Sequence, residues 1–159
     1  MNHPITAAVR FLRENNVGFT PHLYDYVEKG GTGESARQLG VDEHAVVKTL
    51  IFETNEKKPL IVLMHGDRQV STKNLARQIG IKSVEAASAD RASKFTGYIF
   101  GGTSPFGLKT NMPVYVEKTI FDLDKIYING GKRGFLVEIE PGVLKDALAI
   151  NEVDVGIEN

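Results

Sequence analysis

A lysine inside an apolar run is the first residue of this sequence that could take part in chemistry. If residues 46–52 form a strand, the alternation of side chains places Lys48 on the same face as Leu50 and Phe52. Such an ammonium can line a pocket, where partial loss of solvent strengthens its attraction for a substrate oxygen or a phosphate. The alternative is a lysine whose stem lies on apolar surface while its amine reaches water.

Two glycine-rich segments could bring main-chain groups close to a ligand. The first runs from Thr96 to Gly107 and contains Gly101 and Gly102. Glycines allow close approach of the backbone, and successive N–H groups in such a loop can bind an anion or an oxyanion, although a tight turn is an equally good interpretation. The second, residues 129–134, reads Asn-Gly-Gly-Lys-Arg-Gly, which favours a hairpin turn whose two cations either reach phosphates or face solvent.

Several other chemistries lack the residues they need. The chain contains no cysteine, which excludes disulfides, thiolate metal sites and cysteine nucleophiles. It has no P-loop, no G-x-G-x-x-G, no H-E-x-x-H and no G-x-S-x-G motif. The four histidines, at positions 3, 22, 44 and 65, lack metal-ligand spacing, so we expect each to be a surface or packing residue. We therefore expect neither a metal nor a cofactor.

The net charge of -1 conceals an uneven distribution of charge along the chain. Residues 1–65 carry 7 basic and 8 acidic side chains, residues 66–133 carry 11 and 6, and residues 134–159 carry 1 and 6. A basic middle can contact phosphates even in a nearly neutral protein, because counterion release depends on the contacting charges. A solvated basic surface is the alternative. The cations that we expect to contact nucleic acid are Lys73, Arg77, Lys82, Lys132 and Arg133.

Helices and strands are expected to alternate along the chain and to position these residues. Helical spacing and capping residues predict helices over residues 4–14, 34–40, 71–80, 88–95 and 141–148, the first of them with Pro4 in its first turn. Apolar and β-branched runs predict extended segments over residues 19–26, 46–54, 60–65, 113–117, 125–129 and 135–139, with the second and third paired antiparallel.

This pattern predicts the α+β class, with a mixed, largely antiparallel sheet and several short helices. A chain of 159 residues with 42% hydrophobic residues fits one compact domain covering residues 1–159. The longest apolar run, Leu60 to Met64, is far shorter than a membrane helix, and the N-terminus lacks the pattern of a signal peptide. We therefore expect a cytoplasmic protein without a membrane partner.

Three segments together carry a resemblance that none of them carries alone. They are the tetrapeptide Val-Lys-Thr-Leu at residues 47–50, the pattern T-G-Y-x-x-G-G-x-S-P-x-G at residues 96–107, and G-G-K-R-G at residues 130–134. In these segments, and over nearly the whole chain, the sequence resembles the YbaK family of free-standing aminoacyl-tRNA deacylases. That family is related to the editing insertion domain of bacterial prolyl-tRNA synthetases.

The resemblance implies a single α+β domain that removes a wrong amino acid from tRNA, particularly cysteine from prolyl-specific tRNA, without a metal or cofactor. Aminoacyl-tRNA is the implied substrate, and a complex with prolyl-tRNA synthetase is left open. By position, Tyr24 matches the family's pocket tyrosine and Lys48 its central lysine. Gly101 and Gly102 match the backbone that lines the aminoacyl site and are expected to be catalytic together with Lys48.

Four further residues are expected to bind substrate because of where they fall in the resemblance. Thr49 and Ser104 lie inside the matching motifs. Asn129 stands where familiar members have serine, and Thr32 where they have an aromatic residue, so the amino acid recognised is left open.

A chain without a good nucleophile suggests that the substrate supplies its own. The thiol of a cysteinyl ester can attack the ester carbonyl, expelling the tRNA hydroxyl and forming a thiolactone, while the protein orients the reacting groups. For an alanyl or another small aminoacyl ester, a positioned water would be needed instead. A non-catalytic tRNA- or synthetase-binding module and a small-molecule binding protein are the other classes that the sequence allows.

Overall fold

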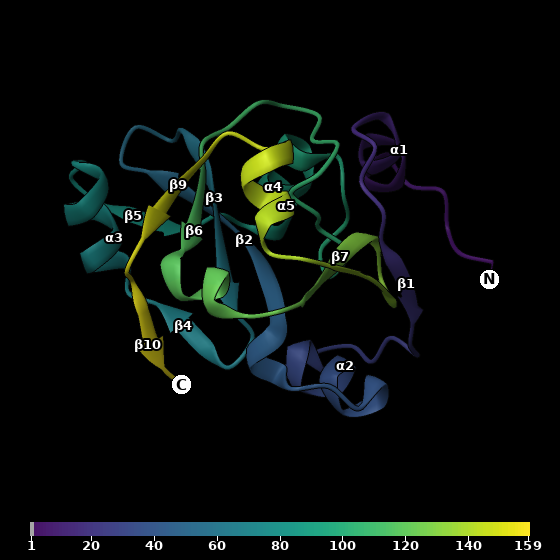
Figure 1. Cartoon of the computed structure of the whole chain (residues 1–159). Coiled ribbons are helices and arrows are strands. Elements are labelled where there is room, and N and C mark those ends of the chain that lie inside the picture. Colours follow the sequence, from purple (N-terminus) through teal and green to yellow (C-terminus); the bar gives the residue numbers. More distant parts are fainter. Residues whose placement is uncertain (1) are drawn as a thin grey trace.

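A mixed eight-stranded sheet forms the centre of the molecule in the computed structural model, which describes residues 2–159 (Figure 1). The strand order is β1-β8-β7-β2-β3-β6-β9, and β5 pairs with the free side of β2. The strands of this sheet are β1 (Thr20–Leu23), β2 (Val46–Thr54), β3 (Pro59–His65), β5 (Val84–Ala86), β6 (Val114–Glu117), β7 (Ile126–Lys132), β8 (Phe135–Ile139) and β9 (Ile150–Val153).

The pairings confirm a mixed sheet. They are antiparallel for β1 with β8, β7 with β8, β2 with β3 and β2 with β5, and parallel for β2 with β7, β3 with β6 and β6 with β9. The expected hairpin of β2 and β3 is confirmed, with Lys48 opposite Met64. Because β3 lies between two strands and is covered on both faces, six of its seven residues are buried.

Five helices cover the two faces of the sheet: α1 (Ala7–Glu14), α2 (Gly31–Leu39), α3 (Thr72–Ile79), α4 (Ala89–Thr96) and α5 (Gly142–Ala147). Buried residues of α1, α4 and α5 share one hydrophobic core, which includes Leu12 and Leu144. On the opposite face α3 packs over Leu60 and Val62, while α2 covers Val46. Figure 1 shows α2 and α3 well apart, so part of that face lies between them.

Capping serines begin two of the helices as expected. Ser71 accepts a hydrogen bond from the Asn74 N–H at 3.2 Å, and Ser88 accepts one from the Arg91 N–H at 3.2 Å. Gly80 ends α3 in the left-handed region. These local signals fix α3 and α4 where the sequence predicts them.

Two helix starts differ from the prediction. Helix α1 begins at Ala7 rather than at Pro4, because Thr6 caps it by accepting from the Val9 N–H at 3.0 Å. Helix α2 begins at Gly31, three residues before the predicted start at Glu34. The glycines of this segment predict a loop. In the structure, Thr32 makes hydrogen bonds to residues distant in the sequence, and these bonds hold the first turn of the helix.

Short strands were the elements that the sequence did not predict. Strands β4 (Arg68–Val70) and β10 (Gly156–Glu158) form a separate two-stranded sheet, and β5 and β9 were also missed. Two short 3₁₀ turns, η1 (Glu43–Ala45) and η2 (Lys118–Asp122), complete the fold. The extended segment predicted over residues 19–26 is a strand only at β1, Thr20–Leu23.

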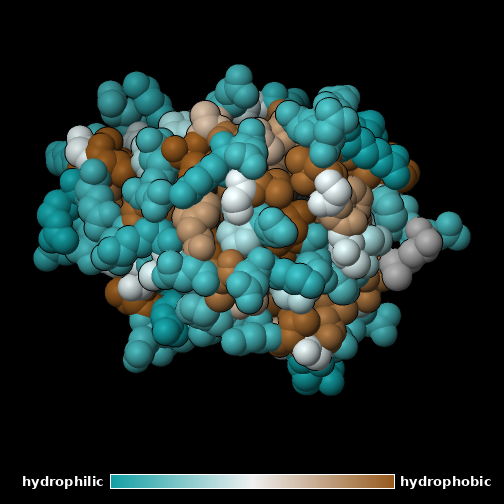
Figure 2. Space-filling view, in the orientation of Figure 1, coloured by the Kyte–Doolittle hydropathy of each residue, from teal (hydrophilic) through white to brown (hydrophobic). Residues whose placement is uncertain are grey.

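The surface offers little continuous apolar area on the face drawn in Figure 2, where apolar side chains form separate patches divided by hydrophilic ones. Across residues 2–159, the helices are too short and too polar for any of them to cross a membrane.

Candidate functional site

A break in the sheet creates the floor of a pocket next to β2. Strand β7 pairs with β2 only at Val46 and Val47, and β5 pairs with it only from Phe52 onward. Between these two contacts, in the described chain, no strand lies along that edge of β2. The bonds from Gly66 N–H to the Val46 carbonyl and from Thr54 N–H to the Lys58 carbonyl show that even-numbered residues of β2 bond to β3.

Odd-numbered residues of β2 therefore direct their main-chain groups away from β3. The carbonyl of Ile51 uses this direction to accept from the Ala87 N–H at 3.0 Å. Thr49, which lies inside the break, directs its N–H and C=O into the gap between β7 and β5. The floor of the pocket thus offers one main-chain donor and one acceptor.

The pocket has a volume of about 500 Å³, and its walls come from regions that are distant in the sequence. The lining includes Tyr24, Tyr26 and Val27 after β1, Thr32 and Ser35 in α2, Val46 to Phe52 in β2, Ala86, Ala87 and Ala92 near β5 and α4, Phe100, Gly101 and Thr103 in the glycine-rich loop, and Asn129 in β7. Six of the eight residues that were expected to be catalytic or to bind substrate line it. They are Tyr24, Thr32, Lys48, Thr49, Gly101 and Asn129.

Lys48 lies half-buried in this wall, on the β2 face that the alternation predicted. Its ammonium donates a hydrogen bond to the main-chain carbonyl of Arg68 in β4. Burial lowers the pKa of Lys48, while the nearby carboxylates of Glu43 and Asp67 oppose that shift. The lysine is therefore a held cation in a partly desolvated site, not a solvated side chain.

Thr32 joins the first turn of α2 to the residues behind Lys48. Its hydroxyl donates to the Glu43 carboxylate at 2.8 Å and lies 3.1 Å from the Gly66 carbonyl oxygen. A β-carbon on Gly66 would come within 2.8 Å of both the Thr32 side chain and the Glu43 backbone, so only glycine fits this approach. Thr32 therefore shapes the pocket wall through a fixed set of bonds.

The glycine-rich loop closes the opposite side of the pocket and is tied down by the β7–β8 hairpin. Asn129 donates from its Nδ2 to the Gly101 carbonyl at 3.2 Å and accepts from the Gly131 N–H at 2.6 Å. Arg133 donates from its Nε to the Phe100 carbonyl at 2.8 Å, and its guanidinium lies 4.9 Å from the centre of the Tyr26 ring. Arg133, expected to bind tRNA, thus lies at the mouth of the pocket.

Gly102 and Ser104 lie outside the lining of the pocket. The N–H of Gly102 donates to the Ile99 carbonyl at 2.9 Å, and a β-carbon there would meet the Lys132–Arg133 backbone at 2.9 to 3.2 Å. Ser104 is fully buried, and its hydroxyl accepts from the Phe106 N–H at 3.2 Å. The structure gives both residues a part in shaping the loop, while Gly101 remains at the pocket.

Tyr24 and Thr49 carry two of the hydroxyls in the pocket lining. Burial raises the pKa of the Tyr24 phenol, which keeps this hydroxyl protonated. Thr49 Oγ1 is the only buried side-chain oxygen or nitrogen without a hydrogen-bond partner among the described residues. An unsatisfied buried hydroxyl costs about 1–3 kcal/mol, so its location beside the break in the sheet is unlike that of an ordinary core residue.

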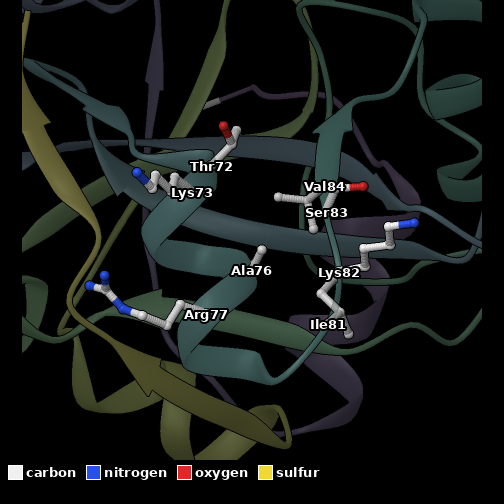
Figure 3. Close-up of a pocket in the computed structure, with 8 residues that line it drawn as sticks. All are labelled: Thr72, Lys73, Ala76, Arg77, Ile81, Lys82, Ser83 and Val84. Carbon is white, nitrogen blue, oxygen red and sulfur yellow. The ribbon is translucent and has the colours of Figure 1, made fainter.

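Three of the other four residues expected to contact tRNA line a groove between α3 and β5, shown in Figure 3, while Lys132 ends β7. Lys73 and Arg77 project from one side of α3, and Lys82 lies across the groove on the segment that leads into β5 (Figure 3). The groove has a volume of about 440 Å³. Val84 lines the groove, and Ala86, two residues further along β5, lines the pocket.

Sequence reasoning missed the cluster behind Lys48. His44 and His65 stack with ring centres 3.7 Å apart, and His44 Nδ1 lies 2.8 Å from the Asp67 carboxylate. The two histidines are packing residues, as expected, but the sequence did not indicate that they pack against each other. The polar residues that flank the central hairpin, at 43–44 and 65–68, were the available signal. No group of three or more metal-binding side chains is placed to hold an ion within residues 2–159.

Comparison with protein families identifies the family to which this fold and pocket belong. The family model for the aminoacyl-tRNA editing domain matches residues 29–147, which include every lining residue of the pocket from Lys29 onward. The chain belongs to the aminoacyl-tRNA editing domain family. The YbaK-type resemblance of the sequence is thereby confirmed.

Individual relatives show which members of this family the chain is similar to. The protein EbsC of Enterococcus faecalis, named as a candidate Cys-tRNA(Pro)/Cys-tRNA(Cys) deacylase, is 31% identical over 137 residues, covering 86% of this chain and 84% of EbsC. A proline–tRNA ligase of Streptococcus equi subsp. zooepidemicus is 29% identical over 102 residues, and the match covers 64% of this chain but only 16% of the ligase. This chain thus resembles EbsC over most of its length and the ligase over one segment.

Solved structures share the fold over almost the entire chain. A hypothetical protein superposes with a TM-score of 0.86 at 26% identity, covering 95% of this chain and 99% of the other. A candidate trans-editing enzyme for prolyl-tRNA synthetase superposes with a TM-score of 0.85, covering 98% and 99% of the two chains. At 19% identity, the second likeness supports the fold alone.

Proposed function

We propose that this protein is a trans-acting deacylase that removes a mischarged amino acid, in the first instance cysteine, from tRNA(Pro). The observation that carries the proposal is the half-buried Lys48 ammonium beside a break in the sheet, in a pocket of about 500 Å³. The family membership and the likeness to EbsC, over most of both chains, support a deacylase.

In the proposed complex, the aminoacyl ester lies over the break in the sheet. The N–H of Thr49 points into this gap, and the N–H of Gly101 lies in the loop across the pocket. Either can donate to the carbonyl oxygen as negative charge develops there. Lys48 supplies a positive charge to the same side of the substrate. Preorganised donors and charges of this kind stabilise the transition state without rearrangement during the reaction.

The nucleophile in this proposal is the thiol of the cysteinyl group. The thiol sulfur forms a bond to the ester carbonyl carbon, the bond from that carbon to the ribose oxygen breaks, and the thiol proton goes to the ribose oxygen. The products are a cyclic thiolactone and tRNA with a free hydroxyl. The chain has no cysteine, and no described serine is paired with a histidine, so the protein's contribution is orientation and charge.

The basic residues supply the proposed contacts to the tRNA backbone. Lys73, Arg77 and Lys82 flank the groove, which meets the same strand, β5, as the pocket does. Lys132 and Arg133 lie on the hairpin at the pocket mouth. A tRNA 3′ end in the pocket would thus place its neighbouring phosphates within reach of these cations.

The test is a deacylation panel with purified protein and cysteinyl-, alanyl-, seryl- and prolyl-tRNA(Pro), together with an S-methylated cysteinyl ester. We expect cysteinyl-tRNA to be cleaved fastest, with the thiolactone detected by mass spectrometry, and the methylated ester to persist. Rapid cleavage of the methylated ester, or faster cleavage of alanyl-tRNA than of cysteinyl-tRNA, would show that the nucleophile is a positioned water and not the substrate thiol. Binding of tRNA without cleavage of any ester would show that the protein is a tRNA-binding module and not a deacylase.

A further inference from the structure

The position of the Lys48 amine depends on a main-chain carbonyl outside its own strand. The amine donates to the carbonyl of Arg68, the first residue of β4, which belongs to the small two-stranded sheet. Arg68 directly follows the tight connection from β3. Any group that fixes residues 67 and 68 therefore also fixes the acceptor of the lysine.

His44 is the side chain that holds this connection. Its Nδ1 donates to the Asp67 carboxylate at 2.8 Å, across 23 residues of sequence. The hydrogen bond from His44 helps to hold the pKa of Asp67 below its usual value, although burial of that carboxyl acts in the opposite direction. The carboxylate is therefore ionised and able to accept at any pH at which the protein would work.

The His44 ring is itself fixed by His65, which is buried. The two rings are nearly parallel, at 7°, with centres 3.7 Å apart. Since a carbonyl can only accept, His65 must donate from Nδ1 to the His44 carbonyl at 2.8 Å. Its Nε2 lies 2.7 Å from the Thr119 hydroxyl, so a neutral His65 accepts there and both ring nitrogens are satisfied.

We propose that His44 is a positioning residue for Lys48, acting through Asp67 and the Arg68 carbonyl to aim the lysine amine into the pocket. The inference deepens the proposed function, since it rests on Lys48 as the cation that acts on the ester. It assigns a role to a histidine pair that is not itself part of the pocket lining.

The charges around this pair come from every element packed against it. Glu43 and His44 lie in η1, Lys48 in β2, and Asp67 and Arg68 at the start of β4, where Arg68 also contacts the Asp67 carboxylate at 3.4 Å. The Glu117 carboxylate of β6 acts on His65 from the other side.

The chain offers a closely matched control for a substitution at His44. His22 Nε2 also lies 2.8 Å from a carboxylate, that of Glu138, and its ring also contacts an aromatic neighbour, Tyr127. This pair lies at the β1–β8 edge of the sheet and does not line the pocket. The test therefore compares His44→Phe, which keeps a ring on His65 but has no N–H, with His22→Phe.

We expect His44→Phe to lower kcat for cysteinyl-tRNA by roughly 10- to 100-fold with little change in KM, because misplacing a reacting group by about 1 Å can cost on the order of 100-fold. His44→Gln, which retains an N–H donor for Asp67, should recover most of that loss. His22→Phe should change none of these values.

A direct readout of Lys48 makes the inference independent of activity. After ¹³C reductive methylation, with the Lys48 resonance assigned by its absence in Lys48→Arg, that resonance should shift in His44→Phe and stay unchanged in His22→Phe. An unchanged resonance together with kcat within twofold of wild type would overturn the inference. If the wild-type protein cleaves no ester, the proposed function fails, while the shift of the Lys48 resonance still decides whether His44 positions the lysine.

Discussion

The cations of this protein lie in two contrasting settings. In the pocket, Lys48 is half-buried and its amine donates to a fixed carbonyl, with two carboxylates nearby. In the α3–β5 groove, Lys73, Arg77 and Lys82 are exposed and extend into solvent (Figure 3). Electrostatic interactions are strong where water is excluded and weak and salt-dependent where it is not. The pocket is therefore suited to catalysis and the groove to capture of a polyanion.

The sharpest test of the pocket side of this contrast is Lys48→Met, which keeps an apolar stem and removes the charge. We expect kcat to fall by roughly 100- to 1000-fold, the usual effect of losing one preorganised electrostatic contact. The loss should be nearly the same at low and high salt, because the site is partly desolvated. Single-turnover deacylation measures it, and circular dichroism shows whether the fold is retained.

Lys57→Met is the control for that substitution, since Lys57 is an exposed lysine paired with Glu85 at 3.1 Å. It should leave kcat unchanged. If Lys48→Met cleaves the ester at a rate close to that of the wild type, the lysine takes no part in the reaction. The functional distinction between the pocket and the groove would then be wrong.

The groove side predicts an effect on binding instead of on the chemical step. Replacing Lys73, Arg77 and Lys82 together by Gln should raise Kd for tRNA by about 10-fold or more at moderate salt. It should also reduce the slope of log Kd against log salt by roughly 2, since each single-strand phosphate contact contributes about 0.7. Fluorescence anisotropy with labelled tRNA at several salt concentrations measures both quantities, and kcat should not change.

The matched control replaces Lys118, Lys125 and Lys145, three exposed lysines that are each paired with a carboxylate at 3.3 to 3.5 Å. The same change in net charge at these positions should leave the salt slope intact. Equal weakening by both triple variants would mean that overall charge, not the groove, attracts the tRNA.

A smaller effect is expected on stability, and it should arise in the wall behind Lys48. Burial lowers the pKa of His65 in the folded protein, so the unfolded chain takes up a proton at a higher pH than the native state does. Stability that is fully present above about pH 6.5 should decline as the pH falls toward the lower native pKa. His65→Gln should flatten this decline in urea unfolding between pH 7.5 and 5.

For His65→Gln, the comparison of slopes matters more than the stability at one pH, because the substitution also changes two buried hydrogen bonds. His3→Gln, on the N-terminal segment where the partly buried ring stacks on Phe135, serves as the control and should keep the wild-type slope. An unaltered decline in the His65 variant would assign the acid sensitivity to other groups.

Local patterns predicted most of the elements, and the reason is visible at particular residues. Strand alternation placed Lys48 correctly, and Ser71 and Ser88 marked two helix starts, because each signal acts within a few residues. Helix α2 was misplaced because its first turn is held by Thr32 through contacts with Glu43 and Gly66, which lie 11 and 34 residues away.

The parts of the site that were missed are long-range in the same sense. The break in the sheet exists because β5 and β7, which are separated by 39 residues, pair with different ends of β2. The contact between His44 and Asp67 similarly depends on how the β2–β3 hairpin folds back. No periodicity or capping signal encodes such pairings, so the sequence predicts the lysine but not the residues that hold it.

The break in the sheet also bears on solubility. An unpaired strand edge normally invites pairing with another chain and is a site of aggregation. Here the open stretch extends only from Lys48 to Ile51, is recessed between two paired strands, and is flanked by α2 and the Phe100 loop. A second chain would need a longer accessible edge to add a strand. The protein can therefore keep the main-chain donor and acceptor of Thr49 open to a small ligand without exposing them to other copies of itself.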